Sequence, residues 1–194
     1  YEAAKQYYAD GKYTRAVVLL QDVISVLKGT DKGEESLYLL GISAYKARDY
    51  EAAANFLKKY YETYTNGLYT QDARFYNAMA LYKNTPEPKL DQTETYEAVT
   101  AFQNLLEIFP QSIYAKESQD MIFKLQDKLV EKEYLSAKTY FDLGSYFGNC
   151  NFGGNNYQAC IITAENAMRD YPYSKRREDF AIMLLRVKYL LAVH

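Results

Sequence analysis

An internal repeat constrains the fold of this chain more than any other feature of its sequence. Residues 1–16 align without a gap with residues 38–53, so that residue 1 corresponds to residue 38, 37 positions later. A third copy begins at Phe75 with the same offset and resumes after an insertion at Tyr96. Repeats of about 20 to 50 residues are units that bury their apolar faces by stacking on one another. The chain is therefore predicted to be an array of stacked units.

Small residues recur at matching positions of the copies and indicate a pair of antiparallel helices in each. They lie where two helices must approach each other closely, at Ala4, Gly41 and Ala78 in the first helices and Ala16, Ala53 and Ala98 in the second. A turn at Asp10-Gly11 or Arg48-Asp49 separates the helices, and a large apolar residue follows each second-helix alanine by four positions. This pattern predicts an all-α tetratricopeptide-repeat α-solenoid, in which helical hairpins stack into a right-handed superhelix.

The second half of the chain follows a distorted version of the same plan. No Gly or Pro occurs between Ser112 and Leu143, and apolar residues there keep helical spacing, which predicts one helix of roughly 30 residues. A loop over 145–155, rich in Gly and Asn, then leads to a helix that ends before Pro172. We therefore predict a single array over 1–194, with four hairpins and the start of a fifth, at 1–28, 33–65, 70–110, 112–172 and 174–194.

Composition and residue types argue against several classes of function. The formal net charge of −2 leaves no basic face for nucleic acid, and no apolar stretch reaches the length of a membrane span. The single histidine, His194, rules out a Ser/His/Asp triad or a histidine metal cluster within this chain. Gly153-Gly154 lacks the Lys-Ser/Thr continuation of a phosphate loop. We therefore predict neither catalysis, nor a cofactor, nor a metal ion.

The short charged runs and the cysteines also have plain structural interpretations. Lys58-Lys59 and Lys175-Arg176-Arg177 are interpreted as solvated helix ends, and Glu34-Glu35 and Glu178-Asp179 as acids near helix starts, where the macrodipole favours them. Two cysteines are too few for a disulfide framework. Cys160 occupies a small position between helices and is predicted to be a buried, unreactive thiol.

Equivalent residues of the first helices are predicted to form ladders along the concave face of the array. The clearest ladder contains Tyr8, Tyr45 and Tyr82, spaced 37 residues apart. Aromatic side chains flanked by lysines suit an extended or helical peptide with aromatic or apolar anchors. The alternative is that some of these aromatics only pack against neighbouring repeats. The predicted partner-binding groove consists of Tyr1, Lys5, Tyr8, Tyr38, Ile42, Tyr45, Lys46, Phe75, Met79, Tyr82 and Lys83.

The order of these features resembles the BamD family, lipoproteins of the outer-membrane β-barrel assembly machinery. The resemblance rests on repeats near 37 residues, an inserted third hairpin and the long helix that contains residues 114–134 and 137–140. Asp170-Tyr171-Pro172, before a last hairpin, also fits, so that the resemblance covers essentially the whole chain. Two departures are the insertion over 84–95 and the loop over 145–155, near which partner contacts are expected to be specific to this lineage.

The resemblance implies a periplasmic scaffold with five repeats, held at the outer membrane by a lipid on a cysteine. It also implies two protein partners, a BamA-like barrel insertase at the carboxyl-terminal repeats and unfolded outer-membrane protein segments in the amino-terminal groove. The chain opens inside a helical pattern and closes on an apolar run, so we expect it to be the interior of a longer protein. The lipid anchor and much of the fifth repeat would then lie outside it, and the membrane would be reached only through that anchor.

Three other functions share the helical-repeat architecture. Another adaptor of the cell envelope, for instance one that coordinates constriction, would show the same repeats, usually after a coiled-coil segment. A cytosolic co-chaperone that binds terminal carboxylates needs Lys and Asn on the ladders, where this chain has Tyr38, Ile42 and Met79. A glycan-acting helical toroid would need paired acids projecting from several first helices, and the ladders carry aromatics instead.

Overall fold

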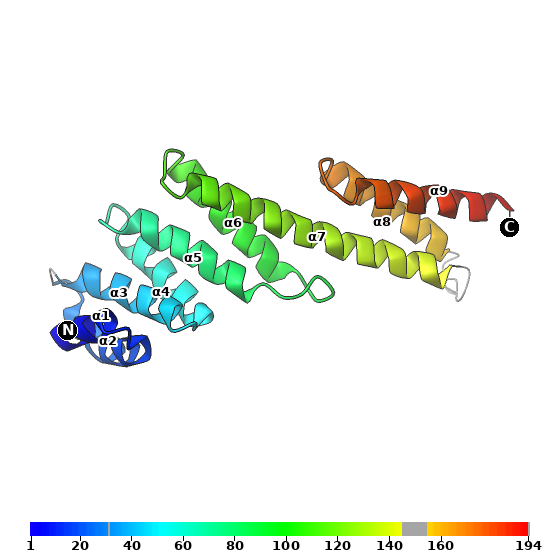
Figure 1. The fold of residues 1–194 in the computed structure, drawn as a ribbon. Helices are drawn as coiled ribbons and strands as arrows, with labels where there is room; N and C mark the ends of the chain where they lie inside the picture. Colours follow the sequence, from blue (N-terminus) through cyan, green and yellow to red (C-terminus); the bar gives the residue numbers. More distant parts are fainter. Residues whose placement is uncertain (31, 145–154, 194) are drawn as a thin grey trace. The chain divides into compact units, whose positions relative to one another are not determined.

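The computed structural model describes residues 1–30, 32–144 and 155–193, and the loop predicted over 145–155 lies almost wholly outside this part of the chain. All regular secondary structure in the described residues is helical, and Figure 1 shows the helices in chain order. They are α1 (Glu2–Ala9), α2 (Tyr13–Leu27), α3 (Gly33–Lys46), α4 (Tyr50–Thr63), α5 (Thr70–Asn84), α6 (Thr93–Ile108), α7 (Ala115–Leu143), α8 (Asn156–Asp170) and α9 (Arg177–Val193). The predicted all-helical fold of stacked pairs is confirmed, and the hairpin limits stay a prediction.

The chain divides into two compact units, which are described separately. The first contains Tyr1–Pro86 and Gln92–Ile122, and the second contains Glu87–Asp91 and Phe123–His194. The first unit holds the three aligned copies, with α1 packed on α2, α3 on α4 and α5 on α6. No helix within the described residues combines the length and the apolar character needed to cross a membrane.

The core of the first unit is built on the repeated small residues. Ala4, Ala16, Ala53, Ala78 and Ala98 are all fully buried, as are the large residues that follow in the second helices, Leu20, Leu57 and Phe102. Gly41 lets α3 approach its partner α4 closely, since a Cβ atom built on it would lie 2.7 Å from Cγ and Cδ2 of Leu57. The small positions therefore set the distance between the paired helices, as predicted.

The turn between the paired helices has the same geometry in the first two copies. The Lys12 amide donates to the Tyr7 carbonyl over 2.8 Å, and the Asp49 amide donates to the Ala44 carbonyl over 3.0 Å. The preceding amides, of Gly11 and Arg48, donate to the Tyr8 and Tyr45 carbonyls over 3.0 Å. The two bonds at each turn form a Schellman motif, which needs a left-handed residue just after the helix. Gly11 supplies it at φ +74° and Arg48 at φ +66°. Arginine pays a steric penalty there that glycine does not.

In the second unit, the later part of α7 packs with α8 and α9. The single long helix predicted after residue 112 is confirmed as α7, which has 29 residues. Its Val130 and Ala137 share a core with Cys160 and Ala164 of α8 and with Phe180 of α9. Cys160 is fully buried as predicted, and burial raises the pKa of its thiol to about 11.

One interpretation of the charged runs is wrong. Arg176 is not a freely solvated helix-end cation, because its Nε and Nη2 atoms donate to the two carboxylate oxygens of Glu131 over 2.8 and 2.9 Å. Its guanidinium also lies 4.2 Å from the centre of the Tyr134 ring and donates to Asp179. The sequence offered no sign of this pairing, since Glu131 lies 45 residues earlier in the chain.

Candidate peptide-binding surface

The first helices α1, α3 and α5 carry the predicted groove residues, and the structure divides these into three groups. Ile42 and Phe75 are buried, with 3% and 4% of their surfaces exposed, and can contribute only to the floor. Lys46 and Lys83 are exposed. The remaining predicted residues are partly exposed, namely Tyr1, Lys5, Tyr8, Tyr38, Tyr45, Met79 and Tyr82.

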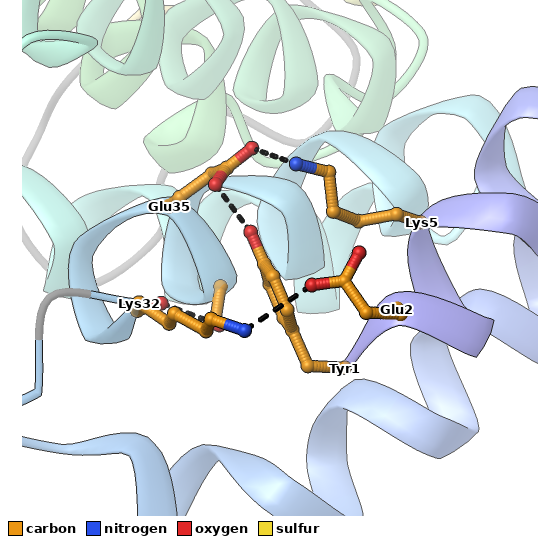
Figure 2. A network of polar contacts seen from close by, with 6 residues as sticks. Tyr1, Glu2, Lys5, Lys32 and Glu35 are labelled. Atoms are coloured by element: carbon orange, nitrogen blue, oxygen red, sulfur yellow. Dashed lines mark hydrogen bonds and ion pairs between the residues drawn. The ribbon is translucent and has the colours of Figure 1, made fainter.

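A polar network ties the amino-terminal end of the ladder to α3 (Figure 2). The Tyr1 hydroxyl and the Lys5 ammonium both donate to the carboxylate of Glu35, the latter over 2.7 Å. Lys32 pairs with Glu2 over 3.2 Å, and its Nζ lies 5.1 Å from the centre of the Tyr1 ring. The bonds from Lys5 and then Tyr1 lower the pKa of Glu35, and the bond to Glu35 raises the pKa of Lys5. Lys5 is therefore occupied by an internal partner.

Tyr8 and Tyr45 are held by tyrosines of their partner helices. The rings of Tyr8 and Tyr13 meet edge to face with centres 5.6 Å apart and planes at 64°, and Tyr45 meets Tyr50 with the same distance and angle. Such edge-to-face contacts add about 0.5–1.5 kcal/mol beyond the area they bury. Both tyrosines thus serve packing and still present part of their surface to solvent.

Two tyrosines that the ladders did not include, Tyr76 and Tyr114, extend the aromatic face. Tyr76 of α5 lies 5.2 Å from Tyr45 and 6.5 Å from Tyr114, between ring centres. Tyr114 stacks on Phe75 at 4.1 Å, just as Tyr69 stacks on Tyr38 at 4.4 Å. We call the resulting face, which lies wholly in the first unit, the tyrosine surface; it comprises Tyr8, Tyr38, Tyr45, Tyr76 and Tyr114.

Most hydroxyls of the tyrosine surface have no partner in the protein. Tyr114 donates to Asp72 over 2.8 Å. Within the described part of the chain, the hydroxyls of Tyr8, Tyr38, Tyr45 and Tyr76 form no hydrogen bond. Burial is the main cause that raises the pKa of all five phenols, so that each stays protonated near neutral pH. The surface therefore offers four neutral hydroxyl groups that can donate and accept.

Carboxylates border the tyrosine surface at equivalent repeat positions. Glu35 and Asp72 are 37 residues apart, and Glu117 follows 45 residues later because the third copy carries an insertion. The negative charge of Asp72 adds to the raised pKa of Tyr38, and that of Glu117 to the raised pKa of Tyr45. Acidic side chains thus border the tyrosine surface, in addition to the exposed Lys46 and Lys83 of the same first helices. In the described residues, no group of three or more His, Cys, Asp or Glu side chains could hold a metal ion.

Stacked helical hairpins with an aromatic first-helix face define a tetratricopeptide-type repeat protein, a class whose surfaces bind other polypeptides. Residues 1–153 match the family described as YfiO, outer membrane lipoprotein. The chain belongs to this family.

Curated relatives agree with the family match. The chain is 27% identical over 146 residues to the putative outer membrane protein assembly factor BamD of Aquifex aeolicus (strain VF5), covering 74% of this chain and 48% of that protein. It is 26% identical over 165 residues to the outer membrane protein assembly factor BamD of Neisseria gonorrhoeae, covering 78% of this chain and 60% of that protein. The resemblance to BamD seen in the sequence is therefore confirmed, and the chain spans about half to three fifths of these relatives.

Proposed function

We propose that this chain is the repeat scaffold of an outer membrane protein assembly factor, and that its tyrosine surface binds unfolded segments of outer-membrane proteins. The relatives bear the name of such a factor, and the tyrosine surface carries aromatic rings and hydroxyl groups that suit the binding of unfolded segments. Strands of a barrel that has not yet closed carry exposed aromatic side chains and unpaired backbone amides. Tyrosine rings can cover the exposed aromatic side chains, and tyrosine hydroxyls can form hydrogen bonds with the unpaired amides.

The observation that carries this proposal is the set of four hydroxyls without partners, at Tyr8, Tyr38, Tyr45 and Tyr76. Rings fixed by neighbouring rings lose little conformational entropy when a ligand binds, which makes them effective contacts. Because Asp72 and Glu117 border them, we expect preferred segments to carry Lys or Arg beside their aromatic residues.

The remaining roles in this proposal rest on the family alone. The scaffold would bind a BamA-like barrel insertase and would lie at the periplasmic face of the outer membrane, held by a lipid anchor. Binding and release need no chemical step, because strand pairing in the growing barrel would withdraw the segment; we therefore propose a non-catalytic role.

Removing the hydroxyls without removing the rings tests the tyrosine surface. The triple variant Tyr38→Phe, Tyr45→Phe and Tyr76→Phe keeps the ring contacts and removes three donors. Each lost hydrogen bond is worth about 0.5–1.5 kcal/mol, so labelled strand peptides of outer-membrane barrel proteins should bind about tenfold or more weakly in fluorescence anisotropy. The matched control, Tyr173→Phe with Tyr189→Phe, alters two well-exposed tyrosines of the second unit, 98% and 67% exposed. Equal affinity for the triple variant and the control would remove the tyrosine surface from the mechanism.

Isolation of the full-length protein from its own membranes tests the proposed assembly. Mass spectrometry should find the barrel insertase among the proteins that co-purify. Recovery of septal or other envelope components in its place would keep the fold and replace the function with that of another envelope adaptor.

A further inference from the structure

A second groove lies in the first unit, between the second helices α4 and α6, and is separate from the tyrosine surface. It encloses about 570 Å³, within the usual range of ligand sites. Asn77 and Leu81 of α5 form part of its lining, and Ala54 and Ala101 leave room on the two flanking helices. The lining residues of α6 run from Thr93 to Asn104, which corresponds to about 16 Å along the helix.

Seven of the twelve residues that line this groove carry neutral hydrogen-bonding side chains. Asn55, Asn104 and Tyr96 face it without any hydrogen bond from their side chains to the rest of the described chain. Asn77 is fixed, since its Nδ2 atom donates to the Ala54 carbonyl over 2.8 Å and its Oδ1 atom accepts from Tyr61 over 3.4 Å. Amide side chains both donate and accept, as peptide groups do, so the lining can pair with the backbone of an extended segment.

An arginine that has no carboxylate partner among the described residues, Arg74, lies next to the groove, beyond the residues that line it. Arg74 precedes Asn77 by three residues on α5, and its guanidinium stacks 4.3 Å from the centre of the Tyr61 ring, which lines the groove. Its Nε atom is buried without a hydrogen-bond partner, and no carboxylate within the described residues pairs with the guanidinium. Because Nε is closed to solvent, a ligand carboxylate can pair only with the two Nη atoms, which are not buried.

The other charges at the groove nearly balance each other. Lys58 and Glu97 both belong to the lining, and Lys58 is held only loosely by Glu62 at 4.0 Å. Arg74 therefore decides the preferred charge of the ligand, and a carboxylate is the group that a guanidinium pairs with most strongly in a polypeptide.

From this arrangement we propose that the groove between α4 and α6 binds an extended polypeptide segment that carries an Asp or Glu side chain. The carboxylate pairs with Arg74, and the backbone of the segment bonds to Asn55, Asn104 and the Tyr96 hydroxyl. This partner has the opposite charge preference from the segments proposed for the tyrosine surface, so one scaffold can hold two different polypeptides at once.

Arrays of synthetic twelve-residue peptides test the proposal with the full-length protein. The probes are random sequences at three net charges, acidic, neutral and basic, and acidic peptides should be retained. Arg74→Met keeps an apolar stem on Tyr61 but removes the charge, and should weaken binding of a retained peptide about tenfold. Asn104→Ala, at an exposed position, should weaken it several-fold.

Two controls separate this groove from other effects. Arg15→Met removes an arginine that also lies over a tyrosine, 5.9 Å from the centre of Tyr7, but not at this groove, and should leave the affinity unchanged. The triple Tyr→Phe variant of the tyrosine surface should also leave it unchanged, so that failure of either site can be recognised on its own. No preference for acidic peptides, equal binding by Arg74→Met, or binding of the neutral glycan chitotriose in place of peptides would each overturn the proposal.

Discussion

Replacing Gly41 by alanine should destabilise the second repeat, although alanine is the better helix former. The added Cβ would lie 2.7 Å from two side-chain atoms of Leu57, where carbon atoms normally keep about 3.5–4.0 Å. Leu57 is fully buried and has no solvent to move into. Overpacking costs about 1–3 kcal/mol, and two contacts as short as 2.7 Å place this substitution at about 2–3 kcal/mol, of which alanine regains about 1 kcal/mol in helix propensity. We expect a net loss of about 1–2 kcal/mol in the free energy of unfolding.

The same substitution should have the opposite sign once Leu57 is shortened. Leu57→Ala removes both atoms that the new Cβ would meet, and the nearest remaining contact is the backbone nitrogen of residue 57 at 3.3 Å. In that background Gly41→Ala should stabilise by about 0.5–1 kcal/mol, because only the propensity term remains. The two substitutions should therefore be non-additive by about 2 kcal/mol or more.

Urea unfolding followed by far-ultraviolet circular dichroism measures these changes for the wild type, both single variants and the double variant. Because repeats can open separately, hydrogen exchange of the α3 and α4 amides should show the loss concentrated in this pair. A neutral or stabilising Gly41→Ala in the wild-type background would refute the reasoning. It would mean that Leu57 can shift to make room for the added methyl group. In the first repeat, Ala4 and Leu20 occupy the positions of Gly41 and Leu57, and both are buried there.

Three further predictions concern single residues. Arg48→Gly should raise the free energy of unfolding by about 0.5–1 kcal/mol in the same urea assay. Glycine removes the steric strain of the left-handed conformation, which outweighs the greater flexibility that it gives the unfolded chain. A lower free energy of unfolding would show that the contacts of the Arg48 side chain stabilise the fold by more than this strain. Since the folded state lowers the pKa of Glu35, the stabilisation from its bonds is present above the unfolded pKa of about 4.3 and disappears as the pH falls through the folded pKa. The stability difference between wild type and Glu35→Gln should accordingly be about 1 kcal/mol at pH 7 and vanish at low pH; a constant difference would contradict this assignment. Cys160 should resist iodoacetamide at pH 8 and react only after denaturation, as peptide mass spectrometry would show, because burial holds the pKa of its thiol near 11; rapid labelling of the folded protein would show that α8 opens readily.

Much of the architecture could be predicted because equivalent positions in each copy of the repeat must meet the same packing requirement. Ala4, Gly41 and Ala78 were expected to be buried between helices, and they are. The 29-residue α7 was expected because no Gly or Pro interrupts its apolar spacing. These are local or periodic properties, which depend on neighbours along the chain or on a copy 37 residues away.

The exposure and pairing of the candidate site residues depended on contacts that the spacing of residues along the sequence does not reveal. Phe75 and Ile42 each share a repeat ladder with partly exposed residues and yet are buried. Ile42 belongs to the same core cluster as Ala4 and Leu20 of the preceding repeat, and Tyr114 stacks on Phe75. Lys5, a predicted groove residue, donates to Glu35, which belongs to the next repeat.

The sequence alone determined the helical pairs, their small contact residues and the long α7, since each follows from periodicity and the size of side chains. Tertiary structure alone decided which tyrosines keep free hydroxyls, where carboxylates border them and that Arg74 stays unpaired beside a polar groove. The physical reason is that exposure and pairing are set by side chains distant in the chain, whose distances exist only after the repeats have stacked.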